Sequence, residues 1–166
     1  YSVTKSVISA LIGIAIQQGY IQDLQQPLVS FFPGREIANL DERKKAITLE
    51  HLLTQTSGLE CNETHSPDKP VMEASDNWIQ FILDRPVLAE PGKQFDYCTA
   101  AVHLLSAVIQ ETTGKSARQF ANENLFLPLG IGPIDEDRWP NDPQGVTIGG
   151  YSLAQTPPDM AKLGYL

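Results

Sequence analysis

The sequence predicts a mainly helical fold, and three observations support this prediction. Apolar residues recur at helical spacing along several stretches, most of which begin at a capping residue and end at a glycine or before a proline. Convincing alternation with a period of two is missing, and residues 145–151 could form one short strand at most. With 166 residues, 42% of them hydrophobic, the chain has the length of one domain and can bury a sizeable core.

The first predicted helix covers residues 2–18 and ends at Gly19, a residue suited to the left-handed conformation that closes many helices. Its apolar residues surround the helix axis instead of forming one stripe, which is typical of a buried helix. The small residues Ser9, Ala10 and Gly13 would let neighbouring elements approach closely. We therefore expect a central helix that is wrapped by others.

Five further helices are predicted from their start and stop signals. In chain order they begin after Thr48, after Ser75 or Asp76, at Thr99 or Ala100, after Ser116 and after Thr156, and the first four end by residues 55, 85, 114 and 127. Residues 59–74 and 127–155 are rich in proline, glycine, asparagine and aspartate. These two stretches are predicted to be ordered surface loops.

The charge distribution argues against nucleic acid and anionic membranes as partners. The formal net charge is −8, and the only basic block is Arg43–Lys45. This block follows Asp41 and Glu42, and the combination is typical of an exposed charged face. The longest apolar run, residues 7–16, is too short to span a bilayer.

The sequence predicts neither a metal site nor a cofactor site. His51, His65 and His103 are scattered without the spacing of metal ligands, and His103 is typical of a histidine that packs within a helix interface. No glycine-rich phosphate loop is present. Cys61 and Cys98 could form one disulfide in an oxidising compartment or remain two thiols in the cytosol, and the sequence leaves both alternatives open.

The opening stretch from Ser2 to Lys5 has the spacing Ser-x-x-Lys at the head of the first helix. Residues three apart lie on the same helix face, so the serine hydroxyl and the lysine amine can meet. A serine hydroxyl becomes an effective nucleophile when a neighbouring base takes its proton. Lysine can be that base if burial and the positive end of the helix dipole lower its pKa from about 10.4 towards neutrality. The backbone N–H of Ser2 could also help to hold a developing oxyanion.

The residues leave a structural alternative beside each catalytic interpretation. Ser2 could cap the helix while Lys5 reaches solvent. Tyr97 and Thr99 stand at the entrance of a later helix, and in an extended segment their side chains share one side, with Cys98 on the other. Tyr97 could relay a proton to a leaving group if Lys5 lowers the pKa of its phenol. The alternative for this second pair is a buried tyrosine with a satisfied hydroxyl and a threonine cap.

With these motifs in order, the chain resembles the serine β-lactamase and penicillin-binding-protein superfamily, in particular its class C β-lactamase-related serine hydrolases and esterases. The matching stretches follow the family's order and cover almost the whole chain: SVTK, LLTQTSGL, EPGKQFDYCTAAVHLLSAVIQETTGKS, LFLPLGI and GGYSLAQTPPDMAKLGYL. The resemblance implies that Ser2 is the acylated nucleophile, Lys5 its activating partner and Tyr97 the proton relay of the Tyr-x-Asn element. It also implies an acyl-enzyme formed from an ester, amide or β-lactam substrate, with no cofactor.

Two departures from the family pattern bear on this expectation. Thr99 stands where the family commonly has asparagine, and it can support the site through a hydrogen bond but offers no amide. The family's Lys/His-Thr/Ser-Gly triplet is absent. The stretch from Gly114 to Ser116 is a helix boundary and does not fit that role. We therefore expect residues 1–166 to form a single helical subdomain of the β-lactamase/DD-peptidase-like fold, truncated at both ends, with most or all of the sheet of the α/β domain missing.

The expected function of the full-length parent is that of a serine hydrolase with a small-molecule acyl substrate, whereas the chain as given is expected to acylate poorly or not at all. The alternatives are a non-catalytic penicillin-recognising sensor and a catalytically inactive interaction module. The apolar surface left without the sheet could support self-association. Relatives are often exported, which favours the cell envelope or secretion and leaves the cytoplasm open.

Overall fold

The structure is a computed structural model that describes residues 1–61 and 68–166. The described part is mainly helical, as predicted, and its β-structure is limited to three isolated bridges. None of its helices is both long enough and apolar enough to cross a membrane. The elements in chain order are α1 (Val3–Gln17), η1 (Leu28–Phe31), α2 (Glu42–Lys45), α3 (Leu49–Leu53), α4 (Asp68–Glu73), α5 (Trp78–Leu83), α6 (Thr99–Thr113), α7 (Ala117–Ala121), η2 (Asn122–Phe126) and α8 (Pro157–Leu163).

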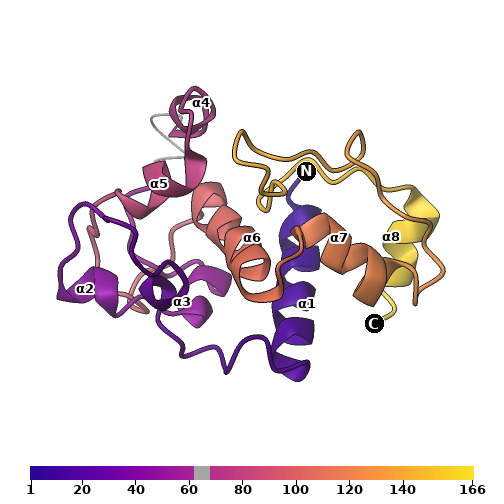
Figure 1. Ribbon diagram of the computed structural model, residues 1–166, viewed down its shortest axis with the longest axis horizontal. Coiled ribbons are helices and arrows are strands. Elements are labelled where there is room, and N and C mark those ends of the chain that lie inside the picture. Colours follow the sequence, from indigo (N-terminus) through magenta and orange to yellow (C-terminus); the bar gives the residue numbers. More distant parts are fainter. Residues whose placement is uncertain (62–67) are drawn as a thin grey trace.

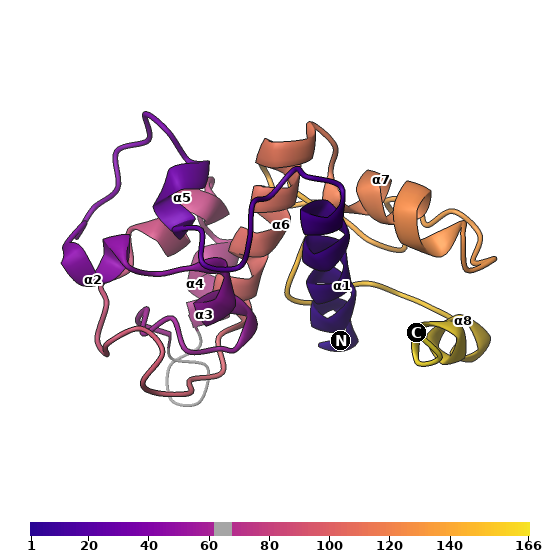
Figure 2. The same cartoon turned by 90° about the horizontal axis from the view of Figure 1, so that it is seen from below.

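Helices α1 and α6 pack against each other at the centre of the molecule (Figures 1 and 2). Helices α2 to α5 lie on one side of this pair, and α7 and α8 lie on the other. Both central helices contribute side chains without exposed surface to the core, among them Ile8, Leu11, Ile12, Leu104, Leu105 and Val108. The two sequence stretches that carry the predicted site residues are therefore anchored in one rigid core.

Most of the predicted helix signals are confirmed. Gly19 and Gly114 close α1 and α6 with left-handed φ values of 79° and 69°. The side chains of Thr48 and Ser116 cap α3 and α7, each in a reciprocal capping box. Thr156 caps α8, where two prolines follow it.

The start of one helix and the content of one predicted loop differ from the prediction. Asn77 caps α5 in place of Ser75 or Asp76, because its Oδ1 accepts from the third N–H of the helix while Ser75 Oγ accepts from Asn77 N. Helix α4 lies within residues 59–74, which were expected to form a loop. Helix α7 continues into the π-helical turn η2, which lies inside the predicted range.

The expectation that α1 is wrapped on all sides is wrong. One face of the helix, which includes Val3, Ser6 and Gly13, is exposed, and apart from the adjoining residues and backbone of α1 itself no atom of the described chain lies within 4 Å of where a Gly13 Cβ would stand. A groove of about 340 Å³ runs beside this face, lined by Val3, Ser6, Val7, Ala10, Met160, Leu163, Gly164 and Leu166. The reason is that α8 approaches this face only along the groove, while the opposite face of α1 packs into the core.

The predicted charged face is wrong at Lys44. This lysine of α2 is only 2% exposed, and its Nζ donates to the backbone carbonyls of Ala38 at 2.5 Å and Leu83 at 2.7 Å. Burial lowers the pKa of the Lys44 ammonium, and the carboxylates of Asp84 and Asp41 partly oppose this. The lysine therefore serves as an internal link between two backbone carbonyls.

Candidate active site

Ser2 stands immediately before α1, and its hydroxyl faces two donors outside the helix backbone. The capping alternative requires Ser2 to accept from an N–H of the first turn, and its side chain makes no such bond. Its Oγ instead accepts from Tyr97 Oη at 2.7 Å and from Lys5 Nζ at 3.3 Å. Ser2 is exposed, so a ligand can reach this oxygen.

Lys5 lies one turn along α1 and directs its amine at three oxygen atoms. The acceptors are Gly150 O at 2.7 Å, Thr99 Oγ1 at 3.0 Å and Ser2 Oγ at 3.3 Å. The amine also lies 4.8 Å from the centre of the Tyr97 ring. Because an ammonium has three donors, these acceptors use its full capacity and fix its direction. The alternative in which Lys5 reaches into solvent is therefore wrong.

Gln55 holds the backbone on both sides of Tyr97. Its carbonyl accepts from Asp96 N at 2.9 Å, and its side-chain Oε1 accepts from Cys98 N at 2.7 Å. Gln55 follows α3 with a left-handed φ of 60°, which is uncommon for a residue with a side chain. Tyr97 itself is 41% exposed, and the residue that caps α6 is Cys98, so the alternative of a buried tyrosine followed by a threonine cap is wrong.

Gly150 joins α1 to α6 at the site. Its carbonyl accepts from Lys5, and three residues later Leu153 N donates to Thr4 Oγ1 at 3.2 Å, so this segment follows α1. On its other side, a Cβ at position 150 would lie 2.5 Å from Thr99 Cγ2. Only glycine allows this approach, which brings the carbonyl within reach of the lysine.

Tyr151 is a second tyrosine near the site, but its environment differs from that of Tyr97. Its hydroxyl donates to the carboxylate of Glu73 in α4. Burial and then this hydrogen bond raise the pKa of the Tyr151 phenol above its ordinary value. Tyr151 therefore stays protonated, and Tyr97 is the phenol that contacts Ser2.

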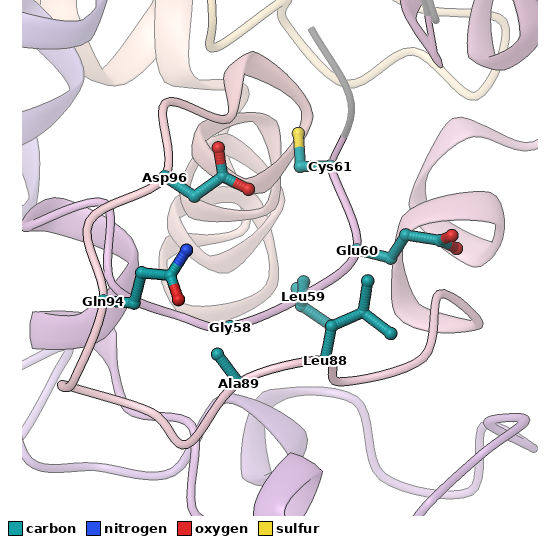
Figure 3. A pocket seen from close by; sticks show the side chains of 8 residues that line it. All are labelled: Gly58, Leu59, Glu60, Cys61, Leu88, Ala89, Gln94 and Asp96. Atoms are coloured by element: carbon teal, nitrogen blue, oxygen red, sulfur yellow. The ribbon is translucent and has the colours of Figure 1, made fainter. Parts of the chain in front are cut away.

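A disulfide joins Cys61 to Cys98, which decides between the two alternatives that the sequence leaves open. The bond ties the start of α6 to the segment that follows α3. Beside it lies a hollow of about 230 Å³, which Figure 3 shows between two loop segments. The hollow is lined by Gly58, Leu59, Glu60, Cys61, Leu88, Ala89, Gln94 and Asp96, and thus adjoins the backbone that carries Tyr97.

The two described histidines, His51 and His103, make hydrogen bonds within the fold. His51 completes the capping box of α3, and His103 is buried in α6 with its Nε2 2.9 Å from Asp142 Oδ2. His65 lies outside the described residues. Among the residues that the structure describes, no three or more His, Cys, Asp or Glu side chains gather as metal ligands would.

Comparison with known proteins places this chain in a family. The family model described as Beta-lactamase matches residues 1–165. The chain belongs to the beta-lactamase family. One relative of this beta-lactamase-family chain is the monacolin J acid methylbutanoyltransferase of Aspergillus terreus, which is 33% identical over 111 residues. That match covers 63% of the chain and 27% of the fungal enzyme.

Solved structures show which fold this chain shares with known proteins. The β-lactamase/D-alanine carboxypeptidase of Yersinia pestis superposes with a TM-score of 0.73 and 24% identity, over 97% of this chain and 50% of its own. EstCE1, described as a hydrolase with promiscuous acyltransferase activity, superposes with a TM-score of 0.75 and 21% identity, over 98% of this chain and 56% of its own. The chain thus spans about half the length of these structures, and the predicted helical part of the β-lactamase/DD-peptidase-like fold is confirmed.

The structure brings together all four site residues that the sequence predicts: Ser2, Lys5, Tyr97 and Thr99. Sequence reasoning missed Gln55 and Gly150. Gln55 lies in LLTQTSGL and Gly150 in GGYSLAQ, two stretches that match the family. The glycine pair was a usable signal, because a glycine often marks a place where another backbone approaches closely. Gln55 offered no such signal, because a glutamine at a helix end is common on protein surfaces.

Proposed function

We propose that the full-length protein that contains this chain is an acyl-serine enzyme, a β-lactamase-related serine hydrolase that forms its acyl-enzyme on Ser2. The observation that carries the proposal is the pair of contacts at Ser2 Oγ, from Tyr97 Oη at 2.7 Å and from Lys5 Nζ at 3.3 Å. Both donors can exchange protons, and a serine with only a capping role needs neither of them.

In the proposed acylation, Ser2 Oγ attacks the carbonyl carbon of an ester, amide or β-lactam, and its proton passes to the pair formed by Tyr97 and Lys5. The bond to the leaving group then breaks, and the same pair returns the proton to the departing oxygen or nitrogen. The pair must begin the step with one proton fewer than a phenol and an ammonium hold together, since otherwise it cannot accept the Ser2 proton. Tyr97 lies closer to Ser2 and acts as the relay, while Lys5 sets the charge beside it.

The negative charge that develops on the carbonyl oxygen needs donors. The N–H of Ser2, at the positive end of α1, can supply one of them. The family resemblance implies a second donor on a sheet strand, and loss of one such donor costs about 10²–10³ in rate. We therefore propose that residues 1–166 alone acylate poorly or not at all. Labelling of Ser2 in this chain by a fluorescent penicillin or fluorophosphonate, as fast as in the full-length protein, would contradict this.

The second step decides between hydrolysis and acyl transfer. The oxygen of water or of an acceptor alcohol attacks the acyl carbon and its proton enters the Tyr97–Lys5 pair. The bond from the acyl carbon to Ser2 Oγ then breaks, and the pair returns the proton to Ser2. Two relatives favour transfer as a second candidate function, since one is named a methylbutanoyltransferase and EstCE1 is a hydrolase with acyltransferase activity. The exposed Ser2 leaves access for either acceptor.

The experiment compares wild-type full-length protein with Ser2→Ala, using p-nitrophenyl acetate. We expect steady release of p-nitrophenol by the wild type and its loss in Ser2→Ala. Formation of the acetyl ester of an added alcohol would identify acyl transfer. A stable stoichiometric adduct without turnover would instead support the penicillin-recognising sensor, and indifference to Ser2→Ala would support an inactive interaction module.

A further inference from the structure

A buried histidine–aspartate pair contacts Gly149, the residue before the one whose carbonyl accepts from Lys5. His103 of α6 is 2% exposed and Asp142 is 7% exposed. His103 Nε2 and Asp142 Oδ2 are 2.9 Å apart, and the ring also packs edge-on against Trp78 with the ring centres 5.5 Å apart. The proposed chemistry does not use either side chain.

The hydrogen bonds define how His103 is protonated. Gly149 N donates to His103 Nδ1 at 3.1 Å, so Nδ1 carries a lone pair. The ring proton is therefore assigned to Nε2, from which it is donated to Asp142. The other carboxylate oxygen, Asp142 Oδ1, accepts from Gln144 N and Val146 N, both at 2.8 Å. Asp142 thus closes its own loop and fixes the orientation of the imidazole.

The glycine pair Gly149–Gly150 connects His103 to the site, because Gly149 bonds the histidine and Gly150 bonds Lys5. A Cβ at Gly149 would lie 3.0 Å from the carbonyl oxygen of Val102, and a Cβ at Gly150 would lie 2.5 Å from Thr99 Cγ2. The backbone at these positions is therefore pressed against α6, where the bond from Gly149 N to His103 fixes its register. The next carbonyl, Gly150 O, accepts from Lys5 Nζ at 2.7 Å, which is the shortest of the three bonds of that amine.

Anchoring of the loop does not by itself require this pair. One turn further along α6, Ser106 Oγ donates to Thr147 O at 2.5 Å, and a bridge links Asn141 to Thr147. Burial of the Asp142 carboxylate is also a weak source of stability, because its loss of hydration offsets what its hydrogen bonds contribute. What distinguishes the pair is its place next to the Lys5 acceptor.

We propose that His103 and Asp142 are positioning residues that hold the Gly150 carbonyl against Lys5 and so direct the lysine amine towards Ser2. The inference rests on the proposed function for its catalytic consequence, but not for its geometric one. The histidine acts through the bond from Gly149 N, and the aspartate acts by keeping the histidine in the tautomer that accepts that bond.

The test uses the full-length protein and three variants with matched shapes. In Asp142→Asn, the new side chain faces His103 Nε2 on one side and the N–H groups of Gln144 and Val146 on the other, but it has an oxygen on only one side. Either orientation therefore sets its amide N–H against another N–H, unless His103 changes tautomer and loses the bond from Gly149 N. His103→Gln places its amide near the former Nε2 and keeps a donor for Asp142, but leaves Gly149 N without an acceptor. Ser106→Ala is the control, because it removes a buried bond between the same helix and the same loop, keeps the Cβ that lies beside Gly149 and leaves the bond from Gly149 N to His103 in place.

The primary readout is the single-turnover rate constant for acylation of Ser2 by p-nitrophenyl acetate, together with KM. We expect Asp142→Asn and His103→Gln to lower the rate constant by about 10–100-fold with little change in KM, as a small misplacement of a catalytic group does. Ser106→Ala should stay close to wild type even though it lowers the melting temperature. Equal losses in all three variants, in proportion to their melting temperatures, would overturn the proposal.

A crystallographic readout separates this inference from the proposed function. If the wild type is not acylated on Ser2, the proposed function fails. The positioning role is then tested by the distance from Lys5 Nζ to Gly150 O in His103→Gln. Loss of that contact in His103→Gln, with its retention in Ser106→Ala, supports the positioning role. Retention in both variants overturns it.

Discussion

Tyr97 donates a 2.7 Å hydrogen bond to Ser2 Oγ while its ring lies against the amine of Lys5. Tyr97→Phe keeps the ring and removes only the hydroxyl. We expect kcat/KM for p-nitrophenyl acetate to fall by about 10²–10⁴ because the relay is lost. Tyr151→Phe is the matched control and should stay near wild type. Initial rates measured on both full-length variants check this, and full activity of Tyr97→Phe would contradict the proposed relay.

Gln55 supports Tyr97 through the bond from Cys98 N to its Oε1. Gln55→Ala removes this acceptor, whereas Gln55→Glu keeps an oxygen at the same place, and both share the left-handed backbone of the wild type. We expect the alanine variant to lose about 1 kcal/mol in the free energy of unfolding. Its acylation rate should fall about tenfold because Tyr97 is less well placed. Urea denaturation and single-turnover acylation measure the two effects, and identical results for both variants would rule out the role of Oε1.

Thr99 accepts from Lys5 Nζ at 3.0 Å. Thr99→Val has nearly the same shape but no acceptor, whereas Thr99→Ser keeps the hydroxyl and loses the methyl group that packs on Gly150. We expect the valine variant to acylate about tenfold more slowly, as the loss of one hydrogen bond to a charged group predicts. The serine variant should remain closer to wild type. The reverse order of the two rates would show that packing on Gly150 matters more than the bond to Lys5.

The fold was predictable where local signals agree with the tertiary structure. Helices α1 and α6 combine long apolar patterns with glycines that adopt left-handed φ values, and α3, α7 and α8 begin at side chains that bond the first turn. The exposed face of α1 was not predictable, because apolar periodicity records which residues can be buried and not what covers them. Lys44 was missed because its two acceptors, Ala38 O and Leu83 O, are backbone atoms that leave no pattern in the sequence.

The side chains of the site could be predicted from the sequence, but the residues that hold them in place could not. Ser2 and Lys5 share one helix face, and Tyr97 and Thr99 stand at one helix entrance, so their types and spacing point to a common site. The bond from Lys5 to Gly150 spans 145 positions in the chain, and no local rule relates two such residues. The contact between His103 and Asp142 spans 39 positions and depends on the path of the intervening loop.

Lys44 predicts a pH dependence of stability. Burial lowers its pKa in the folded state below the ordinary value of 10.5, so between the two values the unfolded chain binds more protons. The free energy of unfolding contributed by this group therefore rises with pH across that window and is constant below it. Lys44→Met should remove this rise.

The same Lys44→Met variant should lower the free energy of unfolding by about 2 kcal/mol at neutral pH, because the carbonyls of Ala38 and Leu83 lose their donor. Urea denaturation at a series of pH values, for the wild type and Lys44→Met, measures both effects. Parallel stability curves for the two proteins would contradict the buried ammonium.

Acylation of Ser2 is the step on which the proposed function depends. Intact-protein mass spectrometry of the full-length protein, quenched early in its reaction with p-nitrophenyl acetate, detects this acylation, and peptide mapping locates the adduct. We predict one acetyl group per protein on the peptide that contains Ser2, and none in Ser2→Ala. Turnover without an adduct on that peptide, or an equal adduct in Ser2→Ala, would show that Ser2 is not the nucleophile.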